Sequence, residues 1–230
     1  MLAFVKERLV IINVSKCAST SMHSLLHSRA DIVIGGSPKL KHLKFRESFG
    51  MLEFLLFGKF DIREFEFVSL FRNPVEWLYS WYCYRSRAEL QNRLHPNYLN
   101  RVIDGMSFEG FCSAYLQEGK KPRCVPGSHQ FDLISDEDGL LGVDKCFSFH
   151  SLDFFESWLS DRLKMKLTFP SKNTSKSFGS RDLSEETLAE FSSKYPNDFR
   201  LFKKLAIDPV VLKEDFNSEE HVITNSSYIK

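Results

Sequence analysis

Two short apolar runs in this sequence end where a helical pattern begins, and these junctions restrict the fold strongly. The first run, LVIINV over residues 9–14, is rich in β-branched residues and precedes a helical pattern that starts near Ser19. The second run, EFEFVSLF over residues 64–71, precedes a helical pattern from Pro74 to about Arg87. The first run is continuously apolar, and the second alternates at first and then becomes continuously apolar, as is typical of strands buried in a parallel sheet. The junctions therefore predict an α/β fold.

The rest of the chain alternates in the same way. A third strand is expected over residues 145–149, and a short apolar run covers residues 32–34. Further helical patterns cover part of 43–60, 108–117, 152–163, a stretch from Ser184 onward, and 196–205. Alternating strands and helices predict a central, mostly parallel sheet flanked by helices. Because no repeat or clear linker divides the chain, we expect a single domain over residues 1–230.

Composition excludes several classes of protein. Lys and Arg number 31 against 30 Asp and Glu, so a globally basic nucleic-acid binder is disfavoured. No apolar run approaches the roughly 20 residues of a membrane span. Lys6, Glu7 and Arg8 interrupt the first apolar stretch, which argues against a signal peptide. The five cysteines form no CxxC pair and suggest reduced thiols, so a cytoplasmic location is expected.

The first junction, V-S-K-C-A-S-T-S-M over residues 14–22, carries the residue types of an anion cradle. It places Lys16 and the hydroxyls of Ser19, Thr20 and Ser21 where a strand ends and a helix begins. Helix N-termini bind phosphate and sulfate through unpaired N–H groups. The segment lacks the glycines of a Walker A loop, so a nucleotide triphosphatase function is disfavoured. An ordinary capped helix with an incidental lysine is the alternative.

The second junction places Arg72 at the end of the strand and Ser80 about two turns into the next helix. An arginine can bind a phosphate group through two parallel hydrogen bonds. Open α/β sheets bind ligands at the carboxyl ends of their strands. The alternative is that Arg72 caps a neighbouring helix or pairs with Glu76.

Together the two segments resemble the cofactor motifs of the sulfotransferases that use 3′-phosphoadenosine 5′-phosphosulfate (PAPS), most closely the carbohydrate-type bacterial and Golgi branch. The family's first motif appears here as S-K-C-A-S-T-S, and its second, R-[ND]-P-x-x-R-x-x-S, appears as R-N-P-V-E-W-L-Y-S. The resemblance implies a P-loop-like sulfotransferase fold with PAPS as cofactor. The residues implied to bind it are Lys16, Cys17, Ala18, Ser19, Thr20, Ser21, Met22, Arg72, Ser80 and Lys176.

Weaker likenesses extend from residue 9 to about 205. They are Lys41-His42, Gln130, the segment V-D-K-C-F-S-F, the segment 173–176, and Y-P-N-D-F-R-L-F. The chain also departs from the pattern. Ser15 replaces a proline, Ala18 a common glycine, Trp77 the second arginine of R-N-P-x-x-R, and His150 a common acid.

The resemblance also implies a mechanism that requires no metal. Lys16 would stabilise charge on the leaving oxygen, and His42 is the candidate base for the acceptor hydroxyl. Lys41 beside it would favour the neutral imidazole. A surface histidine in a basic loop is the alternative for His42. Among the other histidines, His23 and His27 are expected to be structural or exposed, while His95, His129 and His150 are reserve candidates.

The expected acceptor is a hydroxyl-bearing molecule, a carbohydrate or glycan. Two basic clusters could lead an anionic glycan to the site, or they could be solvated faces. They comprise Lys39, Lys41, Lys44 and Arg46, and Arg85, Arg87, Arg93 and Arg101. The competing functions are a nucleotide-dependent kinase of the P-loop type and a catalytically inactive, anion-binding relative.

Overall fold

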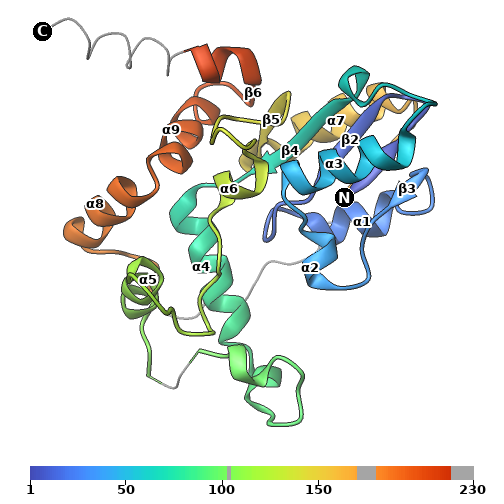
Figure 1. Ribbon diagram of the computed structural model, residues 1–230. Helices are drawn as coiled ribbons and strands as arrows, with labels where there is room; N and C mark the ends of the chain where they lie inside the picture. Colours follow the sequence, from blue (N-terminus) through green and yellow to red (C-terminus); the bar gives the residue numbers. More distant parts are fainter. Residues whose placement is uncertain (103–104, 170–179, 219–230) are drawn as a thin grey trace, which may run out of the picture. The chain divides into compact units, whose positions relative to one another are not determined.

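The structure is a computed structural model that describes residues 1–102, 105–169 and 180–218 (Figure 1). The chain divides into two compact units. Unit 1 comprises residues 1–72, 130–170 and 201–230, and unit 2 comprises residues 73–129 and 171–200. Each unit is described separately below.

Unit 1 is built on a six-stranded mixed sheet whose centre is parallel. The strand order is β3 (Ile32–Val33), β1 (Leu2–Phe4), β2 (Leu9–Ile12), β4 (Glu66–Phe71), β5 (Lys145–Ser148) and β6 (Val210–Leu212). The pairs β2–β4 and β4–β5 are parallel, whereas β1 pairs antiparallel with both β2 and β3, and β6 pairs antiparallel with β5. The predicted α/β class is confirmed and the centre of the sheet is parallel as expected, but the other three pairings of the described strands are antiparallel.

Two parts of the sheet differ from the sequence-based expectation. The N-terminal apolar stretch, residues 1–14, does not form one strand. It contains a hairpin, in which Leu2 pairs with Ile11 and Phe4 with Leu9. The charged residues 6–8 form its turn, where Arg8 has a φ of 52°. The C-terminal strand β6 was not expected at all, because only three residues pair with β5 and one of them, Val211, is buried.

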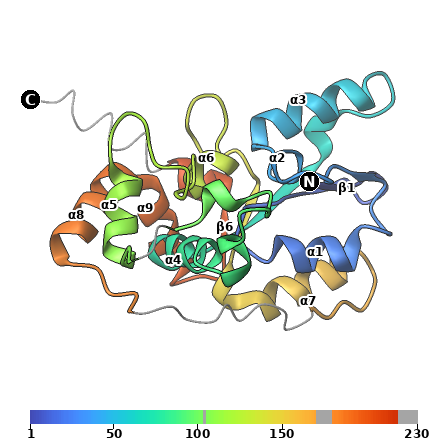
Figure 2. The same ribbon diagram turned by 90° about the horizontal axis from the view of Figure 1, so that it is seen from below.

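Helices cover both faces of this sheet. Figure 2 shows α3 (Phe45–Leu56) on one face and α1 (Ser19–Leu26) with α7 (Leu152–Arg162) on the other. Two shorter helices, α2 (Pro38–Lys41) and α6 (Gln130–Ile134), complete the unit, with 3-10 turns at Ile62–Glu64 and Phe149–Ser151. The central strands are almost entirely buried, and Leu9–Ile12 are 0% exposed, whereas Val33 and Leu212 on the two edge strands are 41% and 39% exposed. This burial on both faces of the sheet explains why the sequence of β2 is a continuous apolar run.

Unit 2 is helical and has an aromatic core. It contains α4 (Pro74–Arg85), α5 (Phe108–Leu116), α8 (Glu185–Lys194), the start of α9 (Pro196–Leu205), and 3-10 turns at Ala88–Gln91 and Tyr98–Asn100. Trp77 is only 2% exposed and packs edge-on against Tyr115, with 6.2 Å between ring centroids. Tyr115 in turn contacts Phe191 and Tyr195. At the position where the resembled motif has an arginine, this chain therefore has a core residue.

The helices are short. The longest in the described part of the chain, α3 and α4, have 12 residues each. None of the described helices is long and apolar enough to cross a membrane, for which about 20 apolar residues are needed.

Candidate anion-binding site

Three segments meet where the parallel strands of unit 1 end. Because β2, β4 and β5 are parallel neighbours, their carboxyl ends lie at one edge of the sheet. The loop over residues 13–18 follows β2, Arg72 follows β4, and Phe149 follows β5. Ligands of open α/β sheets bind at this edge, so the first sequence junction and Arg72 lie where the prediction placed them.

The loop between β2 and α1 has a strained backbone. The N–H of Cys17 donates to the carbonyl of Val14 at 3.3 Å, which closes a turn. Within this loop, Lys16 has a φ of 65° and Ala18 a φ of 53°. The left-handed region costs a residue with a side chain about 1–2 kcal/mol, and such strain persists mainly at functional sites. Turns of this kind direct backbone N–H groups into a concavity that binds anions.

The N-terminus of α1 has unused hydrogen-bond donors. Met22 N–H donates to Ala18 O at 3.0 Å, so Met22 belongs to the helix ladder and does not present the free N–H expected of it. Within the described residues, the backbone N–H groups of Ala18 to Ser21 donate to no backbone or side-chain acceptor, and no acidic residue lies in the first turn. By contrast, the side chains of Asn73, Ser107 and Ser184 cap α4, α5 and α8. Four unpaired donors at a helix start suit an anion.

The three hydroxyls of this helix start differ in position. Ser19 and Ser21 are 6% and 5% exposed, whereas Thr20 is exposed. The Lys41 ammonium donates to Thr20 Oγ1 at 3.2 Å. The structure thus adds a second lysine, from α2, to the end of α1 that follows Lys16, a contact that the sequence did not indicate.

His42 is held by the backbone of the same loop. Its Nδ1 lies 2.7 Å from the carbonyl oxygen of Asn13, so Nδ1 carries the proton and donates it. Nε2 is then the acceptor nitrogen, and it makes no hydrogen bond with a described residue. Burial is the main cause that lowers the pKa of His42, and the charges of Lys41 and Lys16 lower it further. His42 is therefore a neutral imidazole with an available lone pair.

Gln130, which the sequence marked only weakly, joins the two junctions. Its side chain is 0% exposed. Its Oε1 accepts from the backbone N–H of Arg72 at 3.1 Å and its Nε2 donates to the carbonyl of Arg72 at 2.9 Å. The same Oε1 lies 3.4 Å from Cys17 Sγ, which donates to it. One amide thus fixes the end of β4 against the loop that follows β2.

The Arg72 side chain lies over an aromatic ring. Its guanidinium carbon is 4.7 Å from the centroid of Phe149, which follows β5. A planar guanidinium stacks favourably on such a face, and its donors are arranged to match a phosphate group. Phe149 was not among the expected site residues, because only the sheet order brings it beside Arg72.

Cys17 is a buried part of the loop and not a reactive thiol. Its side chain is 0% exposed, and burial raises its pKa to about 12 despite the opposing charges of Arg72 and Lys16. At about pH 8 its thiolate fraction is then about 10³-fold below that of an ordinary thiol. We expect iodoacetamide to leave Cys17 unmodified in the folded protein and to label it in urea, as read by peptide mass spectrometry. Equal labelling rates in both conditions would contradict this burial.

Two of the expected cofactor residues lie outside the described part of unit 1. Ser80 is 8% exposed on α4, which belongs to unit 2, so its part in the same site stays a prediction. Lys176 lies outside the described residues. His150, which stands where the resembled family commonly has an acid, lies in the turn after β5. Its backbone N–H donates to Ser148 Oγ at 3.3 Å.

The two basic clusters are largely engaged within the protein. Lys44 Nζ lies 2.9 Å and Arg46 Nη2 3.0 Å from the carboxylate of Asp132 on α6. In unit 2, the guanidinium groups of the second cluster lie over aromatic rings: Arg85 over Trp81, Arg87 over Tyr84 and Arg101 over Tyr98. Most residues of the two clusters thus have partners within the protein, and a path for anionic glycans stays a prediction.

The reserve histidine His129 has a partner that the sequence did not indicate. Its Nδ1 lies 2.5 Å from Asp198 Oδ2, and Asp198 is 2% exposed. The ring of His129 also packs on Tyr195, with 4.7 Å between centroids. The pair belongs to unit 2, and 69 residues separate its members in sequence.

Comparison with known proteins identifies no relative. A scan against protein-family models found no match, and searches of the curated proteins and of the solved structures found none either. Groups of three or more His, Cys, Asp or Glu side chains that could hold a metal ion do not occur among the described residues. The functional argument therefore rests on the geometry of the site.

Proposed function

We propose that this chain is a sulfotransferase that moves a sulfuryl group from PAPS to a hydroxyl of a carbohydrate acceptor, and that unit 1 has a P-loop-like sulfotransferase fold. One observation carries the proposal: the strained loop that holds Lys16 leads into a helix whose four N-terminal donors have no partner in the described residues. Lys16 and Ala18 keep a left-handed backbone although neither is glycine, the residue that adopts it without strain. Backbone strain of this kind supports a ligand-binding loop rather than an ordinary helix cap.

The residues of the loop fit the phosphosulfate end of PAPS. The N–H groups of Ala18 to Ser21 and the ammonium groups of Lys16 and Lys41 are all donors, as an anion of high charge requires. Arg72, fixed by Gln130, fits the 3′-phosphate. When bound, PAPS supplies the sulfuryl group and a stable bisphosphate leaving group.

The chemistry then needs two groups of the protein. In-line transfer forms a bond between the acceptor oxygen and sulfur while the bond from sulfur to the phosphate oxygen breaks. Lys16 stabilises the charge that develops on that phosphate oxygen. His42 Nε2 takes the proton of the acceptor hydroxyl, since its Nδ1 is committed to Asn13 O.

Calorimetric titration tests the cofactor class. We expect adenosine 3′,5′-bisphosphate to bind without magnesium, and Arg72→Ala to weaken this binding far more than that of 5′-AMP. Binding of ATP only, and only with magnesium, would instead indicate a kinase. If neither nucleotide binds, the chain would be an inactive relative, and the proposal would be overturned.

The pH profile tests the assignment of the base. Burial holds the pKa of His42 below its ordinary value of 6.5, so more than half of the imidazole is neutral at pH 6.5 and the neutral form dominates above it. We therefore expect kcat/KM to fall on the acidic side with a midpoint below pH 6.5, where His42 becomes protonated. His42→Asn should lower turnover about 10²-fold and leave the affinity for the bisphosphate unchanged. A midpoint above pH 6.5, or full activity of H42N, would show that another group is the base.

A further inference from the structure

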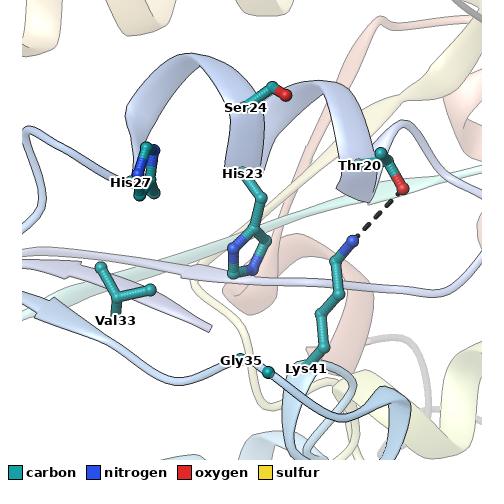
Figure 3. A pocket seen from close by; sticks show the side chains of 8 residues that line it. Thr20, His23, Ser24, His27, Val33, Gly35 and Lys41 are labelled. Atoms are coloured by element: carbon teal, nitrogen blue, oxygen red, sulfur yellow. Dashed lines mark hydrogen bonds between the residues drawn. The ribbon is translucent and has the colours of Figure 1, made fainter.

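A trough runs along one side of α1 and begins at the anion-binding loop. Its volume is ≈ 520 Å³, and Figure 3 shows α1 along one side with the β3–α2 segment opposite. The residues that line it are Thr20, His23, Ser24, His27, Val33, Gly35, Gly36 and Lys41. Thr20 and His27 lie seven residues apart on the helix, which corresponds to about 10 Å at about 1.5 Å per residue.

The lining consists mainly of groups that both donate and accept hydrogen bonds. Burial lowers the pKa of His23 to about 4, so its imidazole is neutral at neutral pH and has one donor and one acceptor nitrogen. Its Nε2 lies 2.8 Å from the side-chain amide of Asn13, so Nδ1 is the nitrogen directed toward Gly35. Ser24 and Thr20 contribute hydroxyls that act in both roles. Hydroxyl groups of a ligand also donate and accept, and they match such a surface.

The charge of the trough does not favour an anion. Lys41 is the one lysine among the described residues that line it, and its ammonium is bonded to Thr20 at the end nearest the loop. No acidic side chain is part of the same described lining, so a cation is disfavoured as well. The neighbouring Lys44 and Arg46 are paired with Asp132. The middle of the trough is therefore polar and uncharged.

The position of the trough connects it to the proposed reaction. Thr20 belongs both to its lining and to the helix start that presents the four unpaired donors, and Lys41 of α2, which also lines the trough, donates to Thr20 Oγ1. Lys41 is followed directly by His42, the candidate base. A hydroxyl at the loop end of the trough would thus lie beside the site where the sulfuryl group is expected.

We propose that this trough is the acceptor-binding site, and that it takes an uncharged, hydroxyl-rich sugar chain rather than an anionic one. The assignment of the occupant as an acceptor rests on the proposed sulfotransferase function. The match between the lining and an uncharged sugar rests on the trough alone, so the two parts can fail separately.

Substitutions at exposed positions of α1 test the trough without disturbing the core. Ser24 lines it and is exposed, so Ser24→Trp would fill it while the helix remains intact. Ser28→Trp is the matched control, because Ser28 is also exposed, follows α1 and does not line the trough. The probes are chitotriose, cellotriose and maltotriose as uncharged chains and a heparin-derived tetrasaccharide as the anionic chain. Binding is read from backbone NMR shifts of the isotopically labelled full chain, with and without adenosine 3′,5′-bisphosphate.

We expect at least one uncharged chain to shift the signals of Ser24, His27, Gly35 and Gly36. S24W should weaken that binding at least tenfold and S28W less than twofold, and neither should change the affinity for the bisphosphate. Binding of the bisphosphate without any uncharged chain, or shifts caused only by the anionic chain, would overturn the trough assignment and leave the sulfotransferase proposal intact. Sugar binding at these residues without bisphosphate binding would retain the sugar site and overturn its role as an acceptor site.

Discussion

Lys16→Asn is expected to lower the rate of sulfuryl transfer about 10³-fold while the protein stays folded. Removing one group that stabilises developing charge in an active site typically costs about 10²–10³ in turnover. In the proposed reaction Lys16 has that role, and it also lies in the loop over residues 13–18 that we propose binds the phosphosulfate group, so we expect the upper end of this range. Transfer is measured with radiolabelled PAPS and a sugar panel, and folding with thermal unfolding of the variant.

Asparagine is the informative replacement because of the backbone at this position. Lys16 has a φ of 65°, and asparagine adopts the left-handed region more readily than most residues with a side chain. Alanine would remove the charge and also alter the strain, so its effect would have two causes. Lys16→Asn removes the charge and keeps the turn.

A second lysine supplies a matched control. Lys164 has a φ of 51° and is exposed in the turn after α7, outside the candidate site. Lys164→Asn should leave transfer and bisphosphate affinity unchanged. Equal losses for K16N and K164N would show that the effect is not specific to the loop, and an active K16N would refute the role of Lys16.

The sequence could predict the parts of the fold that local chemistry decides. Pro74 as the first residue of α4 is one example: Asn73 before it caps the helix by accepting from the N–H groups of Val75 and Glu76. The strand ahead of it, β4 (Glu66–Phe71), also begins and ends close to the predicted range. Caps, proline and apolar runs act within a few residues, and they can therefore be read from sequence.

The remaining features depend on contacts between distant segments or on strain. Lys16 and Ala18 adopt left-handed conformations that sequence assigns to glycine or asparagine, and only the surrounding loop imposes them. Gln130 contacts Cys17 across 113 residues, a pairing that no local pattern encodes. Strand β6 likewise forms because β5 offers it an edge.

Gln130→Leu is expected to lower the free energy of unfolding of unit 1 by about 2–5 kcal/mol. Gln130 is 0% exposed, and leucine of similar size cannot replace its two bonds to the backbone of Arg72. Each buried donor or acceptor left unpaired costs about 1–3 kcal/mol. Urea unfolding measures the loss, and Gln91→Leu at an exposed position should leave the midpoint unchanged.

The same substitution separates support of Arg72 from general stability. Hydrogen exchange at the Arg72 N–H should become much faster in Q130L, because its acceptor is gone, while amides in the middle of β2 keep their order of protection. The affinity for adenosine 3′,5′-bisphosphate should fall, since the end of β4 that carries Arg72 is no longer held against the loop. Gln130→Glu provides the intermediate case: its carboxylate can still accept from the Arg72 N–H, but it cannot donate to the Arg72 carbonyl and places charge beside it. If Q130L lost stability without losing nucleotide affinity, Gln130 would be a core residue that does not position Arg72.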